Sequence, residues 1–283
     1  MRIFKTIAVC GSLLVSGAGS AQAAETWNFY HSQSIPQFAT SLIDSALAEK
    51  IAKLSDGALN VRFRLAGTLQ INAANMTLAV GGNVVQMGDD FFFSGAIPIA
   101  AIMRLPFLVQ TYEDFDKAEK VLRPYVEKAY AAKGIVMLAS YAYTYQYIFG
   151  RRKIETLKDI EGQKIRTSSP ELGEFVRKFH GISVSMTAAE VPSALDRGVM
   201  DGLITGTVGA NSWRDLIKYG YLLRLGIPNS YIIVNAARFK ALSPDLQSKI
   251  RQAAEEAAAL NTATLKQEDL DLYARLREAG IVL

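Results

Sequence analysis

Few residues of this chain have the types and spacing that catalysis requires. The 283 residues include two histidines, His31 and His180, and one cysteine, Cys10. Two separate histidines are too few for a zinc site. The chain also lacks the nucleophile motif Gly-x-Ser-x-Gly and a phosphate-binding loop ending in Gly-Lys-Ser or Gly-Lys-Thr. The sequence therefore predicts no enzymatic activity, no cofactor and no metal site.

The two histidines have different expected places in the fold. His180 precedes Gly181 at the expected end of a helix, where an imidazole can interact with the helix dipole. His31 follows Tyr30 at the expected end of the first strand. For His31 a ligand contact and a structural role are both open.

The adjacent carboxylates Asp89 and Asp90 come closest to an acid and base pair. Neighbouring residues of an extended segment point to opposite faces, so the two side chains are not expected to act on one substrate. We expect two solvated or capping aspartates instead.

One arginine has a favourable position for binding an anion. The segment from Lys164 to Arg166 has the pattern of a strand end, and Ser169 followed by Pro170 is typical of a helix start. Ligands of open α/β sheets gather at the carboxyl ends of strands, and a guanidinium can donate two parallel hydrogen bonds to a carboxylate. The alternative is a surface salt bridge from Arg166, for example to Glu190.

A second group of interest is aromatic. Tyr141, Tyr143, Tyr145 and Tyr147 alternate along an expected strand over residues 135–149, which places four phenol rings on one face. A strand of this length can cross between domains. The tyrosines are either an ordinary half-exposed sheet face or part of a ligand-binding wall.

The elements that carry these residues alternate between strand-like and helix-like patterns, which is typical of an α/β fold. Strand patterns cover residues 27–30, 59–65, 84–87, 135–149, 164–166, 200–204 and 231–235. Helix patterns cover residues 40–54, 72–80, 112–133, 170–180 and 189–197, and a long one runs from Ser243 towards Glu278. A helix as long as the last is expected to span two domains.

Composition excludes some partners. The 31 lysine and arginine residues are scattered among 27 aspartate and glutamate residues, so no basic block exists that could neutralise a row of phosphates. Nucleic acid is therefore not an expected partner, and 283 residues fit about two domains.

Residues 1–23 have the pattern of a signal peptide. Arg2 and Lys5 precede an apolar run over residues 7–15, and small residues end at Ala23, after which we expect cleavage. Cleavage would remove Cys10. Lipid attachment at Cys10 is the alternative, but the bulky Val9 before it argues against this. No later segment is long and apolar enough to span a membrane, so we expect a periplasmic protein that is not membrane-spanning.

The chain resembles a known family in several segments at once. The segments are residues 104–108, 154–166, 190–202 and 231–246, and they look like the periplasmic solute-binding proteins of tripartite ATP-independent periplasmic (TRAP) transporters, the DctP type. This resemblance implies a two-domain fold with a hinge, crossover strands and a domain-spanning helix. The expected domain I covers residues 24–142 plus 231–260, and domain II covers residues 143–230 plus 261–283.

The resemblance also implies a function. Members capture a small organic acid and deliver it to a membrane permease, and the arginine of the Lys-Ile-Arg motif, here Arg166, clamps the ligand carboxylate. Glu190 is expected to orient Arg166, with Tyr145 and Trp213 in support. The candidate polar partners of the ligand are Gln146, Thr205, His31 and Gln86. The alternatives are an exported α/β enzyme and a ligand sensor for a membrane kinase.

Several positions depart from the family pattern. Gln146 replaces a second arginine of sialic-acid-binding members, Thr205 replaces a common asparagine, and Ala188 replaces a common aromatic residue. These departures argue against sialic acid and a simple C4-dicarboxylate as the ligand. The tyrosines of the crossover strand and Trp213 favour a monocarboxylate with an apolar or aromatic body, with the alternative that these aromatic residues belong to the core. The chain also stops at Leu283, where members usually continue, so we expect either a shortened C-terminus or a sequence that is part of a longer chain.

Overall fold

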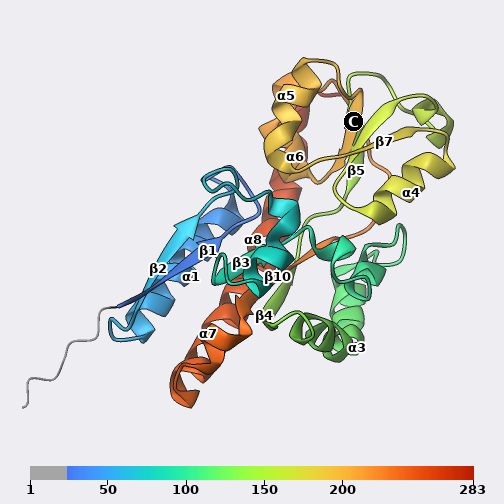
Figure 1. Ribbon diagram of the computed structural model, residues 1–283. Helices are drawn as coiled ribbons and strands as arrows, with labels where there is room; N and C mark the ends of the chain where they lie inside the picture. Colours follow the sequence, from blue (N-terminus) through green and yellow to red (C-terminus); the bar gives the residue numbers. More distant parts are fainter. Residues whose placement is uncertain (1–23) are drawn as a thin grey trace, which may run out of the picture.

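The computed structural model describes residues 24–283, so the expected signal peptide at 1–23 lies outside the described residues. Two five-stranded sheets form the centres of two lobes, and the long helix α8 (Pro244–Glu278) runs from one lobe into the other (Figure 1). The expected α/β class and the domain-spanning helix are confirmed. No described helix is long and apolar enough to cross a membrane.

The first sheet is mixed and belongs to the first lobe. Its strands lie in the order β2 (Leu59–Arg64), β1 (Glu25–Tyr30), β3 (Met87–Asp90), β10 (Asn229–Asn235) and β4 (Ile135–Ala142). The first three strands are parallel to one another, and β10 runs antiparallel to both β3 and β4. The carboxyl ends of β1 and β3 therefore lie side by side.

Helices cover both faces of this sheet and bury its apolar side chains. They are α1 (Ala39–Leu54), α2 (Met76–Gly81), α3 (Tyr112–Ala131), the short α7 (Ala236–Lys240) and the first half of α8. Trp27 and Phe29 of β1 are fully buried against α1 and α8, while Tyr30, on the opposite face, packs with Met76 of α2. Because side chains alternate along β1, they pack into two separate cores, one on each face of the sheet.

The second sheet is built in the same way in the second lobe. Its order is β7 (Ile182–Ser185), β6 (Lys164–Thr167), β8 (Gly202–Thr205), β5 (Tyr147–Gly150) and β9 (Tyr219–Tyr221). β6 is parallel to β7 and β8, whereas β5 is antiparallel to β8 and β9. The helices of this lobe are α4 (Pro170–Lys178), α5 (Val191–Asp196) and α6 (Thr207–Ser212).

Short 3-10 turns connect many of these elements. They are η1 (Ala73–Asn75), η2 (Phe93–Gly95), η3 (Ala100–Arg104), η4 (Leu157–Ile160), η5 (Ala188–Glu190) and η6 (Arg214–Leu216).

The start of α8 follows the cap chemistry that its sequence predicts. The Ser243 side chain accepts a hydrogen bond from the backbone N–H of Leu246, and Pro244 occupies the first turn, where a missing N–H costs nothing. The helix then contacts α1 and β4 in the first lobe and α6 in the second. A 35-residue helix of this kind ties the two lobes together along one side.

Two predicted strands differ from the observed ones. The expected single strand over 135–149 is wrong, because pairing with β10 ends at Ala142 and the chain crosses to the second sheet before β5 begins at Tyr147. The strand expected at 84–87 lies instead at Met87–Asp90, which is buried throughout despite its two aspartates. The expected domain boundaries stay predictions.

Candidate ligand-binding site

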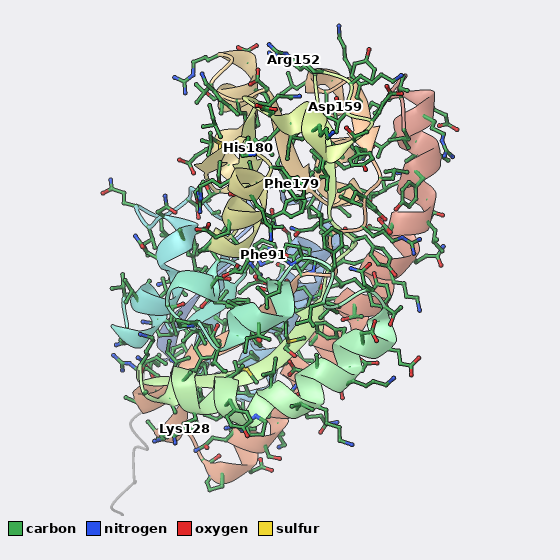
Figure 2. All side chains as sticks on the ribbon, turned by 90° about the vertical axis from the view of Figure 1, so that its right-hand side faces the viewer. Phe91, Lys128, Arg152, Asp159, Phe179 and His180 are labelled. Carbon is green, nitrogen blue, oxygen red and sulfur yellow. The ribbon has the colours of Figure 1, made fainter. Side chains whose placement is uncertain are left out.

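A cavity lies between the two lobes, where the loops after several strands meet. The cavity has a volume of about 60 Å³, counted as the space that the centre of a water molecule can occupy. One water molecule requires only ~10–15 Å³ on the same measure, so the cavity has room for more than one. Phe91, one of its lining residues, lies at the junction of the lobes (Figure 2). The lining residues are Gln33, Phe38, Thr40, Phe91, Phe92, Tyr143, Thr144, Gln146, Arg166, Ser168, Ala188, Thr205, Gly206, Val208, Gly209, Trp213, Pro228 and Leu265.

The topology explains why these residues meet. Gln33 follows β1, Phe91 follows β3, Ser168 follows β6 and Gly206 follows β8. In each sheet the two strands concerned are parallel, so their carboxyl ends open at the same edge. The cavity therefore occupies the position that open α/β sheets favour for ligands.

Arg166 near the end of β6 supplies the charge of the cavity. Its side chain is almost completely buried, with the residue 4% exposed. Nε donates to the backbone carbonyl of Met186 at 3.0 Å and Nη1 donates to the carbonyl of Ile204 at 3.3 Å. No described residue accepts a hydrogen bond from Nη2, and Arg166 is the one charged side chain among the described residues that line the cavity.

The electrostatics of Arg166 suit an anionic ligand. Burial lowers the pKa of Arg166 to about 10, and the nearby charge of Glu190 opposes this shift. The guanidinium therefore stays positively charged at neutral pH. A buried cation that lacks a carboxylate partner is costly, so an incoming carboxylate would relieve that cost.

The expected roles of Glu190 are not observed. Its Oε2 accepts hydrogen bonds from the backbone N–H and the hydroxyl of Thr187, which caps the short turn η5. Two backbone carbonyls orient Arg166 instead. The alternative of a surface salt bridge is wrong as well, because Arg166 is buried and the bonds it donates go to backbone carbonyls, with no ion pair to Glu190 among the described residues.

Two expected polar partners lie in the cavity. Gln146 comes from the segment that joins β4 to β5, and its Nε2 donates weakly to Oγ of Ser168 at 3.5 Å. Thr205 ends β8, the strand that lies between β6 and β5. Together with Ser168 these side chains give the cavity that holds Arg166 groups that both donate and accept hydrogen bonds.

The rest of the wall is largely apolar. Trp213 lines the cavity, as do Phe38, Phe91 and Leu265. Of the four alternating tyrosines only Tyr143 lines it.

The remaining tyrosines have other contacts. Tyr141 and Tyr147 are fully buried, and Tyr145 packs under the guanidinium of Arg224 at 4.6 Å from its ring centroid. The expectation that all four rings share one face is wrong, because the chain leaves the first sheet after Ala142.

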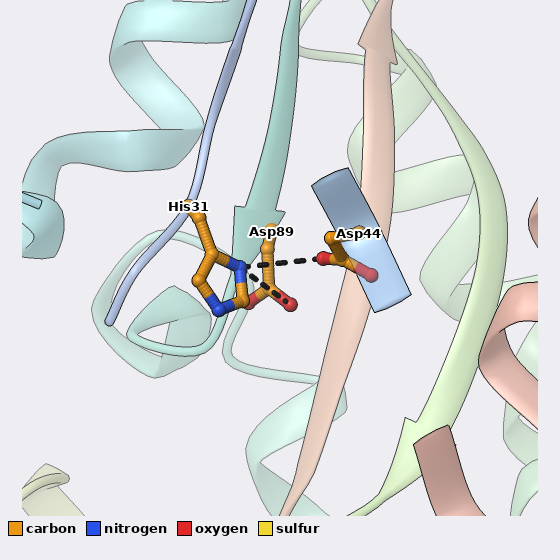
Figure 3. A group of neighbouring side chains, drawn as sticks. All are labelled: His31, Asp44 and Asp89. Atoms are coloured by element: carbon orange, nitrogen blue, oxygen red, sulfur yellow. Dashed lines mark ion pairs between the residues drawn. The ribbon is translucent and has the colours of Figure 1, made fainter. Parts of the chain in front are cut away.

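His31 and Gln86 do not line the cavity. His31 is fully buried between Asp44 and Asp89, with Nδ1 at 3.3 Å and 3.5 Å from their carboxylate oxygens (Figure 3). Gln86 lies before β3, at the opposite end of the strand from the cavity, and its Oε1 accepts from the backbone N–H of Asn28 at 2.8 Å. Of the two roles left open for His31, the structure favours the structural one.

The expectation of solvated or capping aspartates at 89 and 90 is wrong. Both are buried on opposite faces of β3, where each is held by hydroxyl groups. Asp89 Oδ1 accepts from Ser32 and Ser230, and Asp90 Oδ2 accepts from Thr77 at 2.5 Å. Burial raises the pKa of Asp90 to about 7. For Asp89, burial also acts to raise the pKa, but the charge of His31 together with the hydrogen bonds from His31, Tyr141 and Ser230 outweighs it and lowers the pKa below its usual value.

Sequence reasoning missed the side of the cavity that the first lobe supplies. Gln33 and Phe38 precede α1, Thr40 lies in its first turn, and Phe91 and Phe92 follow β3. The rule that drew attention to Arg166, that ligands gather at the carboxyl ends of strands, applies equally to β1 and β3. It could have found these residues from the predicted ends of the two strands.

The sequence matches a described protein family over most of its length. The model of the family "bacterial extracellular solute-binding protein, family 7" (DctP) matches residues 35–283. Among curated proteins, the 2,3-diketo-L-gulonate-binding periplasmic protein YiaO of Escherichia coli (strain K12) is 24% identical over 220 residues. That alignment covers 74% of this chain and 66% of YiaO, just under two thirds of that relative.

Solved structures show the same fold. A Bordetella pertussis extracytoplasmic solute receptor that binds pyroglutamic acid, DctP7, is similar with a TM-score of 0.86 and 21% identity over 91% of this chain and 86% of that one. A TRAP periplasmic solute-binding protein from Roseobacter denitrificans with bound β-D-glucuronate gives a TM-score of 0.84 at 22% identity. The second comparison covers 91% of this chain and 87% of that one.

Proposed function

The chain belongs to the family 7 (DctP) bacterial extracellular solute-binding proteins, and from this premise we propose that it is the extracytoplasmic receptor of a TRAP transporter. It captures a small organic acid between its lobes through Arg166 and delivers the acid to a membrane permease. Its family consists of binding proteins, not enzymes. We also propose that export to the periplasm follows removal of residues 1–23.

One observation carries the proposal. Arg166 is a buried, charged guanidinium in an interlobe cavity, and its Nη2 donates to no described residue. A ligand carboxylate would accept hydrogen bonds there, and these bonds strengthen where water is excluded. When the lobes close around Arg166 and the ligand carboxylate, the exclusion of water strengthens binding. The closed, loaded protein also differs in shape from the open one, so a permease can distinguish the two.

The walls indicate the class of acid. Because Arg166 is the single cation among the described residues that line the cavity, the cavity balances one carboxylate, and a second carboxylate would be buried without a partner. Trp213, Phe38 and Phe91 offer apolar surface to the body of the ligand, while Gln146 and Thr205 offer polar contacts. We therefore propose a compact monocarboxylate with an apolar body.

Two ligands of similar proteins share the single carboxylate of this class. Pyroglutamic acid and glucuronate, bound by two of the similar structures, each carry one carboxyl group. Glucuronate also carries several hydroxyl groups, which need more polar partners than this wall supplies. We propose that the acid of this receptor is nearer to pyroglutamate in polarity.

A thermal-shift screen of organic acids on the protein without residues 1–23 tests the proposal. A ligand that binds only the folded state stabilises it by about 2.7 kcal/mol at a hundred times its Kd. We expect monocarboxylates with apolar bodies to raise the melting temperature, and Arg166→Ala to abolish the rise while the variant still unfolds cooperatively.

A matched control is Arg152→Ala, which changes an exposed arginine in the same lobe. We expect it to keep the full shift. If Arg166→Ala kept the affinity of the unaltered protein, the arginine clamp would be wrong. If no acid shifted the unaltered protein, the receptor function itself would be contradicted.

A further inference from the structure

A buried group of ionisable side chains lies beneath the first-lobe side of the cavity. His31 follows β1, Asp44 lies in α1 and Asp89 lies in β3, and all three are 0% exposed (Figure 3). We call these three residues the His31 cluster. None of them lines the cavity, so the proposed binding of an acid does not use them directly.

The cluster requires a positive charge on His31. Nδ1 faces both carboxylates, at 3.3 Å from Asp44 and 3.5 Å from Asp89. Two buried carboxylates are costly without a cation, and no described lysine or arginine pairs with either of them. Although burial alone would lower the pKa of His31, the charges and hydrogen bonds of Asp89 and Asp44 raise it to about 9. At neutral pH both ring nitrogens therefore carry a proton.

The second ring nitrogen connects the cluster to the cavity. Nε2 lies 3.2 Å from Oγ1 of Thr40, and Thr40 lines the cavity. A protonated Nε2 can only donate, so Oγ1 accepts from it. The hydroxyl hydrogen of Thr40 must then point elsewhere, and no described residue accepts it. The direction left for it is the cavity.

A second connection leaves the cluster through Asp89. The hydroxyl of Tyr141 donates to Asp89 Oδ2, and burial raises the pKa of Tyr141 well above its usual value, so the phenol keeps its proton. The Tyr141 oxygen lies 3.3 Å from that of Tyr143, and the two rings stack with centroids 5.3 Å apart. Because the Tyr141 hydrogen is already used, Tyr143 donates to Tyr141. The oxygen of Tyr143, which lines the cavity beside Gln33, can then only accept hydrogen bonds from its other neighbours, which include Gln33.

We propose that His31 is a positioning residue whose cluster fixes the direction of hydrogen bonding at two hydroxyls of the cavity. Thr40 is held as a donor and Tyr143 as an acceptor. This inference rests on the proposed function, because it concerns the same ligand. It selects acids that present an oxygen acceptor to Thr40 and an N–H or O–H donor to Tyr143.

A metal ion is the competing explanation of the cluster, because the three possible ligand atoms lie within 4.8 Å of one another. Hydrogen bonds already engage Asp89 and one oxygen of Asp44, however, and the other oxygen of Asp44 has the ion pair with His31. Asp89 accepts from Ser32, Ser230 and Tyr141, and Asp44 Oδ1 accepts from Asn261 at 3.1 Å. A metal would also require Nδ1 to lose its proton, so the two explanations predict opposite protonation states.

Nitrogen NMR of the imidazole tests the protonation state without any ligand. The variant His180→Gln leaves His31 as the one histidine of the chain, so its signals are unambiguous. We expect both ring nitrogens to carry protons at neutral pH, with no change on adding EDTA. A neutral ring at neutral pH, or nitrogen shifts that change when EDTA removes a metal, would overturn the proposal.

Binding measurements test the second half of the proposal, with L-pyroglutamate as the probe. Thr40→Val keeps the shape of the side chain but loses the donor, and we expect its Kd to rise about tenfold, whereas Thr40→Ser should stay close to the unaltered protein. Thr68→Val, on an exposed threonine, is the control.

A modified probe tests the role of Tyr143. We expect replacement of the ring N–H of L-pyroglutamate by oxygen to weaken binding to the unaltered protein, and we expect Tyr143→Phe to bind both probes equally.

The outcomes separate this inference from the proposed function. If L-pyroglutamate binding needs Arg166 but is unchanged in Thr40→Val, the inference is wrong and the receptor function stands. If neither this probe nor any other acid of the thermal-shift screen binds, both are contradicted. In His31→Gln, if it folds, binding should weaken as in Thr40→Val, with no further loss in the double variant.

Discussion

The Nε of Arg166 donates a hydrogen bond to the backbone carbonyl of Met186 at 3.0 Å. A second backbone carbonyl, that of Ile204, accepts from Nη1 at 3.3 Å. Main-chain atoms of β8 and of the loop after β7 therefore hold the guanidinium in place. Since a side-chain substitution removes no main-chain carbonyl, the orientation of Arg166 should tolerate conservative changes in the side chains around it.

We therefore predict that Glu190→Gln leaves ligand affinity within about twofold. The glutamine oxygen can still accept from Thr187 and keep the turn η5 capped. Only the weak electrostatic influence of Glu190 on Arg166 is lost, and Glu190 is exposed to screening solvent. Isothermal titration calorimetry with the acid from the screen measures the effect. A loss of tenfold or more would mean that Glu190 orients the clamp after all.

A second prediction concerns Gly209 in α6, which lines the cavity. A Cβ there would lie 2.3 Å from Oγ1 of Thr205 and 3.2 Å from the Trp213 ring. We expect Gly209→Ala to displace Thr205 and weaken binding about tenfold or more, although alanine favours the helix itself.

The control for Gly209→Ala is Gly95→Ala, because a Cβ at the exposed Gly95 meets nothing within 4 Å. Kd values from calorimetry and far-UV circular dichroism spectra of both variants make the comparison. Equal affinities of the two variants would contradict the crowding argument.

Local chemistry made part of the site predictable. Ser169 accepts from the backbone N–H of Leu172 and Pro170 begins α4, as their order predicts, and this fixes the end of β6 and the place of Arg166. Thr205 and Gln146 followed only from the family resemblance. Both line the cavity, but whether they touch a ligand stays a prediction.

The His31 cluster could not be predicted in the same way. Asp89 lies 58 positions after His31 in the chain, and the two meet only because β3 pairs with β1. The alternation of side chains along β3 assigns Asp89 and Asp90 to opposite faces of the sheet. It does not predict that helices cover both faces and bury both aspartates. An aspartate at a strand end is usually solvated. Long-range packing of α1 and α8 overrode that expectation here.

The burial of Asp90 leads to a prediction about acid conditions. Burial raises its pKa from 3.8 to about 7, so the folded protein holds this proton more tightly than the unfolded chain does. Its contribution to stability is therefore present below pH 3.8 and falls as the pH rises towards 7.

Asp90→Asn should remove that part of the pH dependence, since an amide oxygen can still accept from Thr77 and Tyr130. Urea unfolding of both proteins across this range measures the free energy of unfolding at each pH. We expect the difference in stability between variant and unaltered protein to grow in favour of the variant as the pH rises. A constant difference would mean that Asp90 does not titrate in this range.

The charge of His31 leads to a test on the alkaline side, where stability should again fall as the pH rises. The pKa of His31 rises from 6.5 to about 9 on folding, because the attraction of Asp89 and Asp44 outweighs burial. A raised histidine pKa gives stability that is fully present below pH 6.5 and is lost as the pH rises through about 9.

The free energy of unfolding should therefore fall between pH 6.5 and about 9. We expect the His180→Gln variant, which retains His31, to show this fall as steeply as the unaltered protein. In His31→Gln the fall should be absent, although the variant starts from a lower stability because Asp44 and Asp89 lose their cation. Urea unfolding at closely spaced pH values gives both curves, and an equal slope in His31→Gln would show that the imidazole is not the group that titrates.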